Sequence, residues 1–293
     1  MVIKIKRITK KIVQRFGFCR FKSIWPTLSD KKKNFLIDKV TIKSSIETLN
    51  DIKITIVNEQ KGAYMRFGDG DIFLMLGKDD MLHQANRKMA AEMKEAIKFK
   101  KGVTHKGFPF HSQLLGYEKG MEVDMHLVSD VDALKFLAAT HSFIDIHNIY
   151  TSFALHYLAT FNQEFCVQFL RYLRSTDPIF VGNKNLAPEL LKKLFSETHI
   201  KTPASNSYLE IDRIEKELIE ELDKKKNEFQ VIVVAMGCPG RILQKRILKK
   251  GFNVYLFDFG SLLDAFNNDN TRLWIDLAGG AENLKNILNK LDN

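Results

Sequence analysis

The chain has few cysteines and no long apolar run. Its three cysteines, Cys19, Cys166 and Cys238, are scattered and odd in number. They therefore form neither a metal-ligand pair nor a disulfide framework, and a reducing, cytoplasmic setting is the simplest expectation. No apolar run among the 293 residues reaches the length that spans a bilayer. The first residues are too charged for a signal peptide.

Most of the chain has no excess of basic over acidic residues, although the net charge is +10. Residues 1–43 hold 13 Lys or Arg and two acids, whereas the other 250 residues hold 32 bases and 33 acids. A nucleic-acid-binding body carries a basic face of its own, so this balance argues against nucleic acid as a partner. The length suits one large α/β domain or two small ones. We expect a basic extension over 1–43 and a single α/β domain over 44–293.

The N-terminal extension has the pattern of a basic amphipathic helix. Ile5, Ile8, Ile12 and Phe16 recur at helical spacing, and Lys and Arg fill most of the positions between them. Such a helix can lie on an anionic membrane surface, and it can equally dock its apolar stripe on the body of the protein. Both interpretations stay open, so the protein is expected in the cytoplasm, either free or peripheral at the inner face of the membrane. Residues 26–33 are expected to form a linker.

From Ser44 onward, helical and strand patterns alternate. Predicted strands cover 63–67, 178–181, 199–202, 230–236 and 253–257; predicted helices begin at Ser44 or Ser45 and cover 81–98, 130–139, 149–173, 187–196, 208–225 and 241–250. Residues 230–236 are almost purely β-branched and apolar, which is typical of a strand buried on both faces. Alternation of this kind implies right-handed crossovers and a parallel sheet. The predicted fold class is α/β, with a Rossmann-like, mostly parallel sheet flanked by helices.

The most informative stretch follows the first predicted strand. Arg66 is followed by Gly68, Asp69, Gly70 and Asp71, and ligands of an open parallel sheet bind beyond the carboxyl ends of its strands. Two carboxylates one residue apart can both face a hard cation such as Mg²⁺ or Mn²⁺, which would offset the charge of a leaving diphosphate. The arginine can add a bidentate phosphate contact, and the glycines let the backbone approach a ligand. The alternative is a capped turn, with one of the acids serving as a helix N-cap.

Four later loops also follow predicted strands. Residues 237–241 (Gly-Cys-Pro-Gly-Arg) open a helix, and free amides at a helix N-terminus suit a phosphate group. This loop lacks the full Gly-x-Gly-x-x-Gly fingerprint and the Walker lysine, and tight strand–helix packing explains it equally well. Asp258 can bind a ribose hydroxyl, act as a base or cap a helix. Lys184 can reach a phosphate, and residues 203–207 offer helix caps. No histidine pair has zinc-protease spacing, and sequence order alone supports no Ser-His-Asp arrangement.

Taken in order, these segments resemble the glycosyltransferases of the GT-D fold, once catalogued as the domain of unknown function DUF1792. Residues 66–71 (Arg-Phe-Gly-Asp-Gly-Asp) look like the Arg-x-Gly-Asp-Gly-Glu signature of that family. Residues 234–243 resemble its strand, glycine loop and helix. Residues 251–260 are similar to its Gly-Tyr…Asp-x-Gly segment, and residues 199–208 to its Pro-x-x-Asn region. The resemblance covers roughly residues 44–265.

The resemblance implies a GT-D type Rossmann-like fold, a nucleotide-sugar donor and an acid pair that binds Mn²⁺ or Mg²⁺. It makes Asp69 and Asp71 the expected metal ligands, and Asp69 and Asp258 the expected catalytic residues. The residues expected to contact the donor are Arg66, Gly68, Gly70, Asn206, Gly237 and Gly240. Position 71 departs from the family, because aspartate replaces glutamate and is one methylene shorter. The metal prediction therefore rests more firmly on Asp69.

The expected function is metal-dependent sugar transfer of the hexosyltransferase class. The donor is expected to be a UDP-sugar, and the acceptor a glycan or lipid-linked molecule in surface polysaccharide or glycoprotein glycan synthesis. An inverting enzyme needs a base near the acceptor hydroxyl, and Asp145, Glu210 and Asp258 are candidates. One alternative is another Rossmann-type nucleotide-dependent transferase, such as a methyltransferase, which would not need Asp69 and Asp71 together. The other is a non-enzymatic membrane-surface adaptor that acts through the basic N-terminus.

Overall fold

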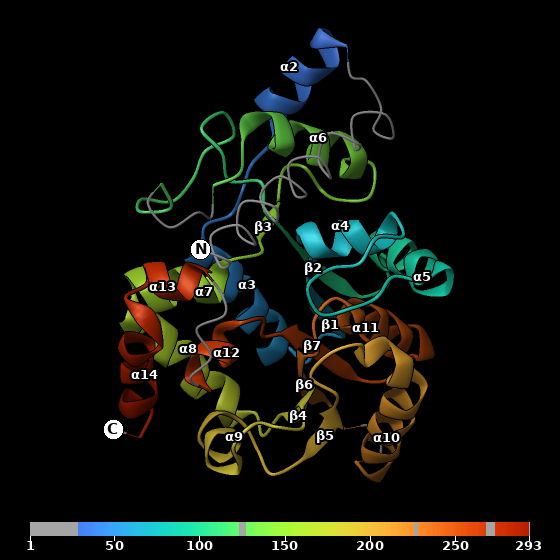
Figure 1. The fold of residues 1–293 in the computed structure, drawn as a ribbon, viewed down its shortest axis with the longest axis vertical. Helices are drawn as coiled ribbons and strands as arrows, with labels where there is room; N and C mark the ends of the chain where they lie inside the picture. The colour runs from blue at the N-terminus through green and yellow to red at the C-terminus, as the bar shows by residue number, and fades with distance from the viewer. Residues whose placement is uncertain (1–28, 123–126, 226–227, 268–272, 293) are drawn as a thin grey trace, which may run out of the picture.

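The computed structural model describes residues 29–122, 127–225, 228–267 and 273–292, so the amphipathic pattern of residues 5–16 lies outside the described residues. Its centre is a seven-stranded sheet (Figure 1). The strands are β1 (Gly62–Arg66), β2 (Val103–Phe108), β3 (Tyr150–Thr151), β4 (Ile179–Asn183), β5 (His199–Thr202), β6 (Gln230–Ala235) and β7 (Val254–Asp258). Their order is β3-β2-β1-β7-β6-β4-β5, and all neighbours pair in parallel. The predicted parallel α/β fold is confirmed.

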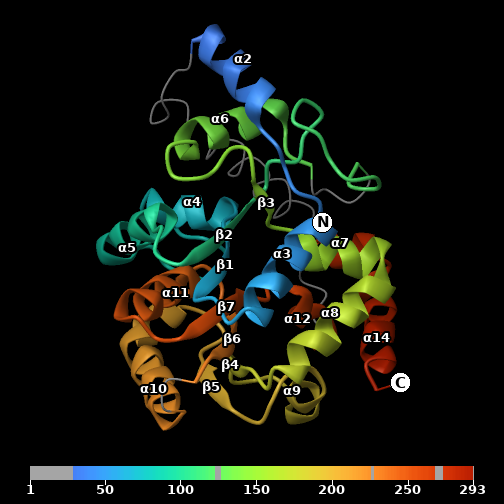
Figure 2. The same ribbon diagram turned by 180° about the vertical axis from the view of Figure 1, so that it is seen from behind.

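Helices cover both faces of the sheet, which gives three layers (Figures 1 and 2). One face carries α3 (Ser45–Val57), α7 (Ala154–Phe161), α8 (Gln163–Ser175), α9 (Pro188–Leu194), α12 (Leu262–Phe266), α13 (Leu273–Leu277) and α14 (Gly280–Lys290). The other carries α4 (Asp69–Met75), α5 (Arg87–Lys98), α10 (Ile211–Lys224) and α11 (Pro239–Lys250). The core cluster of this second face also takes in α2 (Asp30–Lys39) and α6 (Asp130–Thr140).

Strand β6 shows why this sequence forms a two-sided sheet. Val231 and Val233 belong to the core under the first group of helices, whereas Ile232 and Val234 belong to the core under the second. Successive side chains of a strand point to opposite faces, so an uninterrupted apolar strand needs cover on both. All four side chains are buried, as the predicted strand over 230–236 requires.

The helix predicted to begin at Ser44 or Ser45 is confirmed. The Ser44 hydroxyl accepts a hydrogen bond from the backbone N–H of Glu47, and the Glu47 carboxylate accepts one from the backbone N–H of Ser44. Such a capping box satisfies two amides that the helix itself leaves without partners. It fixes the start of α3, which packs against the sheet next to α7.

Two predicted helices have wrong boundaries because N-cap side chains start helices at positions that the spacing did not indicate. The helix predicted over 81–98 begins only at Arg87, where Asn86 caps α5. The helix predicted over 149–173 is divided at Asn162, whose side chain accepts from the N–H of Phe165 and starts α8. Its first residues form the short strand β3 instead. An N-cap side chain competes with helix continuation, and helical spacing alone does not reveal this.

The segment before residue 44 is partly attached to the body. Residues 30–33, predicted to be linker, begin helix α2, whose N-cap is Ser29. Leu36 of α2 is buried in the second core cluster. Thr41 and Lys43 exchange backbone hydrogen bonds with residues 146–149 beside β3. The domain boundary at residue 43 stays a prediction, but Leu36, Thr41 and Lys43 contact the domain. None of the helices in the described ranges has the length and apolar character needed to cross a membrane.

Candidate functional site

A cleft of about 1550 Å³ opens beyond the carboxyl ends of the strands. Its lining includes residues that follow β1, β5, β6 and β7, together with the loop of residues 78–83. Strand β4 connects onward to its neighbour β5, whereas β6 connects onward to β7 on its other side. Connections that leave two adjacent strands in opposite directions create a switch point, where α/β proteins bind ligands. The predicted convergence of the strand-end loops is therefore present.

The described lining of this cleft is rich in acids. Its charged residues are seven aspartates and three cations: Asp69, Asp71, Asp79, Asp80, Asp132, Asp258 and Asp264, with Arg66, Lys78 and Arg241. Several of the acids are buried or bonded within the protein, as described below. The balance still matters for a ligand, because an anion entering this cleft meets more negative than positive groups.

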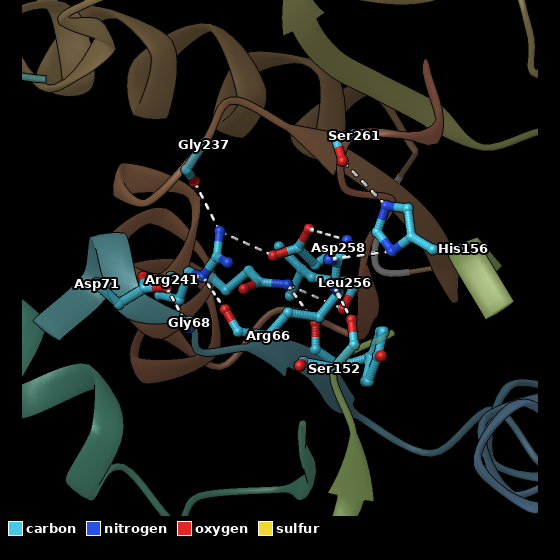
Figure 3. A network of polar contacts seen from close by, with 12 residues as sticks. Arg66, Gly68, Asp71, Ser152, His156, Gly237, Arg241, Leu256, Asp258 and Ser261 are labelled. Carbon is cyan, nitrogen blue, oxygen red and sulfur yellow. Dashed lines mark hydrogen bonds and ion pairs between the residues drawn. The ribbon is translucent and has the colours of Figure 1, made fainter. Parts of the chain in front are cut away.

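Arg241, in the first turn of α11, joins Asp71, which follows β1, to Asp258, the last residue of β7 (Figure 3). Its Nε lies 3.2 Å from Oδ1 of Asp71, and its Nη1 lies 2.9 Å from Oδ2 of Asp258. Its guanidinium also donates to the backbone oxygens of Gly237 and Arg66. The two carboxylates are 2% and 4% exposed. One buried arginine thus holds the ends of β1, β6 and β7 together.

Burial and pairing act against each other on these groups. Burial raises the pKa of Asp71 to about 6, although Arg241 and the backbone N–H of Gly68 lower it. Burial by itself lowers the pKa of Arg241, but Asp258 and Asp71 more than offset this, so the pKa is raised above its ordinary value. The arginine therefore stays charged, and at neutral pH the cluster is an ion network with charges of both signs.

Asp69 and Asp71 point to different places. Oδ2 of Asp71 accepts from the backbone N–H of Gly68 at 2.8 Å, as a capping residue of α4 does. Asp69 is exposed at the cleft, and its Oδ1 accepts from the N–H of Gly70 at 2.8 Å. Asp71 therefore acts as a capping residue, as the capped-turn alternative predicted for one of the two acids. Asp69 instead lines the cleft with an exposed side chain.

The carboxylates around Asp69 fit a metal that takes some of its ligands from the protein and the others from a substrate and water. Within the described residues, no group of three or more His, Cys, Asp or Glu side chains forms a metal site. Mg²⁺ is often held by one or two carboxylates together with phosphate oxygens and water. Asp79 and Asp80 line the cleft with Asp69, and Oδ2 of Asp80 lies 3.2 Å from where a Cβ on Gly70 would stand. The metal-binding roles of Asp69 and Asp71 stay predictions.

Arg66 is fixed along the wall of the cleft. Its Nε donates to the backbone oxygen of Ser152, and its Nη1 lies 3.9 Å from Oδ1 of Asp258. Its Nη2 lies 3.5 Å from Nδ1 of His156, a buried residue of α7. A Cβ on Gly260, whose φ is +71°, would fall 1.3 Å from Nη1 of Arg66. Only glycine at position 260 leaves room for this arginine.

Gly237 is also required by its surroundings. Its φ is +69°, and a Cβ there would lie 2.5 Å from Nε2 of the buried His83. The cleft is lined by Gly237 and Cys238, and the Sγ of Cys238 donates to Oδ2 of Asp80 at 3.2 Å. The predicted glycine loop therefore reaches the cleft at the start of α11, beside the loop that carries Asp80.

Two predicted donor contacts lie apart from the described lining. Asn206, with φ +52°, accepts from the N–H of Gln84 and donates from its own backbone to the oxygen of Leu82, so it fastens the loop before α5. A Cβ on Gly240 would stand 3.0 Å from Cγ1 of Val234, which is the close strand–helix packing considered above. Donor contacts by Asn206 and Gly240 stay predictions, and their positions favour a structural role.

Three other candidates also lie apart from that lining. Asp145 accepts from the N–H of His147 and the amide of Asn148. Glu210, the N-cap residue of α10, forms an ion pair with Arg213 in that helix. The side chain of Lys184 is exposed. Of the three candidate bases, the described cleft takes in only Asp258.

Sequence reasoning missed the roles of His156, Arg241 and Asp80. Arg241 was named as the last residue of the strand-end glycine loop of residues 237–241, but no role was assigned to it. His156 lies in an apolar helical stretch and gave no signal. Asp80 lies in a segment predicted to be at the edge of a helix. Each acquires its position through residues that are distant in the chain.

No protein-family model and no curated protein matches the sequence. The fold is nevertheless similar to solved structures of DUF1792. A selenomethionine-substituted DUF1792 structure aligns with 18% identity and a TM-score of 0.59, over 86% of this chain and 87% of the other. A DUF1792 structure described as having a distinct glycosyltransferase fold aligns with 17% identity and a TM-score of 0.58, over 86% and 87%. A structure described as a new glycosyltransferase (DUF1792) from Streptococcus sanguinis aligns with 15% identity and a TM-score of 0.58, over 83% of this chain and 86% of the other.

At this level of identity the comparison shows the fold. The predicted GT-D type, Rossmann-like architecture is confirmed by these neighbours, which cover most of both chains. Fold alone does not define an activity. Chemistry has to be argued from the side chains that the fold brings to the strand ends.

Proposed function

We propose that the protein is a glycosyltransferase that uses a nucleotide-sugar donor. The observation that carries this proposal is the convergence of Arg66, Asp69, Gly237 and Asp258 at one cleft beyond the strand ends. The fold supports it, since structures of the same architecture are described as glycosyltransferases. An open strand-end cleft with glycine at a helix N-terminus suits a diphosphate-containing ligand.

A divalent cation belongs to this proposal for an electrostatic reason. The described lining carries seven acids and three cations, and a nucleoside diphosphate brings further negative charge. Mn²⁺ or Mg²⁺ bound at Asp69 would offset both, and when bound it would stabilise the leaving diphosphate as a Lewis acid. The proposed ligands are Asp69 and, through its side chain or water, Asp71. Asp71 already pairs with Arg241, so Asp69 carries the larger share.

The protein side chains have distinct proposed roles. Arg66 is held at the wall by Ser152 and Asp258, so it meets a phosphate without first losing the freedom of a long side chain. Asp258 keeps Arg66 and Arg241 in place. The acceptor hydroxyl must lose a proton as its oxygen forms the bond to the anomeric carbon and the diphosphate oxygen departs. Asp258 and Asp69 are the proposed catalytic carboxylates for that charge and proton movement.

Calorimetry with UDP tests the proposal. We expect UDP to bind in the presence of Mn²⁺ and to bind at least about 10-fold more weakly after chelation, because the acid-rich lining is then uncompensated. Asp69→Ala is expected to remove most of this metal dependence. Asp223→Ala, at an exposed position of α10, is the matched control. UDP binding that is unchanged by both chelation and Asp69→Ala would contradict the metal role.

Calorimetry also distinguishes the proposed glycosyltransferase from the alternative, a methyltransferase. A methyltransferase would bind S-adenosylmethionine and not UDP. Its cofactor carries no diphosphate, so neither Asp69 nor Mn²⁺ would affect its affinity. Binding of S-adenosylmethionine without UDP binding would replace the proposed reaction class.

A membrane role is proposed for the basic N-terminus. Residues 1–28 hold eight Lys or Arg and no acid, and Phe35 of α2 is 55% exposed next to Lys31, Lys32 and Lys33. Basic residues near an anionic surface each contribute about 1 kcal/mol. The expected acceptor, a glycan or lipid-linked molecule, is consistent with a surface location.

Liposome sedimentation tests this role. Deleting residues 1–28 spares the backbone pairing of Thr41 and Lys43 with the body. The deletion removes eight of the basic residues and should strongly weaken binding to phosphatidylserine vesicles at low salt, whereas UDP binding should remain. High salt should weaken binding of the full chain. An adaptor without enzymatic activity would instead show vesicle binding and no UDP binding.

A further inference from the structure

Ser261 occupies an unusual place at the end of β7. It follows Gly260 and lines the cleft next to Arg66. Two nitrogen atoms approach its hydroxyl oxygen. Nε2 of His156 lies 3.1 Å away (Figure 3), and Nε1 of Trp274 lies 3.0 Å away. The indole and imidazole rings also pack edge to face, with centroids 4.6 Å apart. The hydroxyl is therefore fixed from two sides.

The direction of each hydrogen bond follows from the donor inventory. An indole N–H only donates, so Trp274 donates to Oγ of Ser261. A guanidinium also only donates, so Nη2 of Arg66, 3.5 Å from Nδ1 of His156, makes that ring nitrogen the acceptor. A neutral imidazole then carries its hydrogen on Nε2. His156 consequently donates from Nε2 to Ser261.

Both acceptor positions of the Ser261 oxygen are thus filled by protein donors. A serine hydroxyl has two lone pairs and one hydrogen. Among the described residues, Oγ of Ser261 has no partner that would accept this hydrogen. Because Ser261 lines the cleft, the hydrogen is available to a ligand there. The bonds from Arg66 through His156 to Ser261 all run in one direction, and such chains polarise the last donor.

We propose that Ser261 is a fixed hydrogen-bond donor to a phosphate oxygen of the bound nucleotide-sugar. The inference rests on the proposed function for its ligand. A phosphate oxygen accepts without needing to donate, and Arg66 at the same wall supplies positive charge beside it. Ser261 is accordingly a substrate-binding residue. It is not a nucleophile activated by His156, because that role requires the hydroxyl hydrogen to point at the imidazole.

The orientation is tested without any ligand, by ¹⁵N NMR of the histidine rings. Comparing the full-length protein with His156→Asn assigns the signals of His156. The expected result is a neutral ring protonated at Nε2. A ring protonated at Nδ1 would make Nε2 the acceptor of the Ser261 hydrogen and would overturn the proposal.

The ligand is tested by calorimetry with UDP and uridine in the presence of Mn²⁺. Ser261→Ala removes a hydrogen bond to a charged group, so UDP should bind about 10-fold to 100-fold more weakly. Uridine, which lacks phosphate, should bind Ser261→Ala and the unmodified protein equally. Ser175→Ala is the matched control, since Ser175 is exposed on α8 and outside the described cleft lining. Thermal unfolding checks that both variants are folded.

The possible failures are distinguishable. If the unmodified protein binds UDP and Ser261→Ala binds it equally well, the inference about Ser261 is wrong while the proposed function stands. If Ser261→Ala loses affinity equally for UDP and uridine, Ser261 contacts the nucleoside, and the proposed phosphate contact is wrong. If the unmodified protein binds no UDP, the proposed UDP-sugar donor is wrong, and so is the contact of Ser261 with its phosphate. The ¹⁵N NMR result for His156 does not depend on that outcome.

Discussion

At the scale of single residues, Arg241 explains how a cleft this acidic remains assembled. Its guanidinium pairs with both Asp71 and Asp258, two buried carboxylates at adjacent strand ends. A buried charge that loses its partner is far more costly than an exposed one. The arginine therefore stabilises the fold and shapes the site at the same time.

Replacing Arg241 with methionine should destabilise the protein by about 3–5 kcal/mol, because Asp71 then stays buried without its cation and Asp258 keeps only the 3.9 Å contact with Arg66. Urea unfolding at pH 7 measures the loss. Lys249→Met, at an exposed position of the same helix, is the control and should change the unfolding free energy by less than about 0.5 kcal/mol. Equal effects of the two substitutions would show that the ion network contributes nothing.

Gly260 tests how strictly Arg66 is positioned. Gly260→Ala introduces strain of about 1–2 kcal/mol for a left-handed residue, and its Cβ collides with the guanidinium of Arg66. We expect both a loss of stability and at least about a 10-fold loss of UDP affinity. Gly77→Ala shares the strain, at φ +73°, but its Cβ meets nothing within 4 Å. It should lower stability and leave UDP affinity unchanged; equal affinities of the two variants would refute the steric explanation.

The sequence predicted which residues gather at the site better than it predicted what each one touches. Asp69, Gly237 and Asp258 do line one cleft, because parallel strands end at one edge. The partner of Asp71 lies 170 positions further along, and no local pattern encodes that pairing. The glycine of the Asp258-Phe259-Gly260 run was noted for the family resemblance, whereas its physical reason is the space that Arg66 occupies.

At the scale of elements, the strand that runs beside β1 carries an acid-sensitive feature. His105 lies in β2 and His111 follows it, and each is 2% exposed. Burial lowers the pKa of both residues to about 4. His105 contacts the hydroxyl of Tyr255, and His111 that of Thr151. Both rings are therefore packed in the neutral form.

The pH dependence of stability follows with a definite sign. In the unfolded chain these histidines titrate near pH 6.5, so below that pH the unfolded state binds more protons than the folded state. Stability is thus full above pH 6.5 and falls as the pH drops toward 4. Each histidine should account for about 2 kcal/mol of the loss between pH 7 and pH 5.

Comparing His111→Gln with the unmodified protein isolates this effect. Unfolding free energies at pH 7 and pH 5 are measured by urea titration for both. The difference between the two pH values should shrink by about 2 kcal/mol in the variant, since glutamine does not titrate. An unchanged difference would mean that protonation of His111 does not govern acid stability.

Element types were predictable, and several element ends were not. Strands β4 to β7 and the helices between them follow from apolar spacing and β-branched runs. The helix predicted over 81–98 failed because residues 78–86 form a loop held by Asp80 and Asn206. Asp80 accepts from backbone N–H groups close to it in sequence, a local bond that competes with helix formation, and Asn206 accepts from the loop across a long sequence distance.

At the scale of the whole molecule, alternation of helix and strand predicted a parallel sheet with two covered faces. It did not predict that β7, the last strand in the chain, would lie between β1 and β6. That order depends on which strands pack together in three dimensions. It is also what places Asp258 beside Arg66, and so it decides the composition of the site.

The central claim is that this strand-end cleft transfers sugar from a nucleotide donor. The most direct measurement is release of nucleoside diphosphate from a panel of UDP-sugars and other nucleotide-sugars, with Mn²⁺ present and after its removal. The account predicts slow release from at least one donor, dependent on Mn²⁺ and lost in Asp69→Ala. No release from any donor, by a folded protein that also binds none of them, would contradict it.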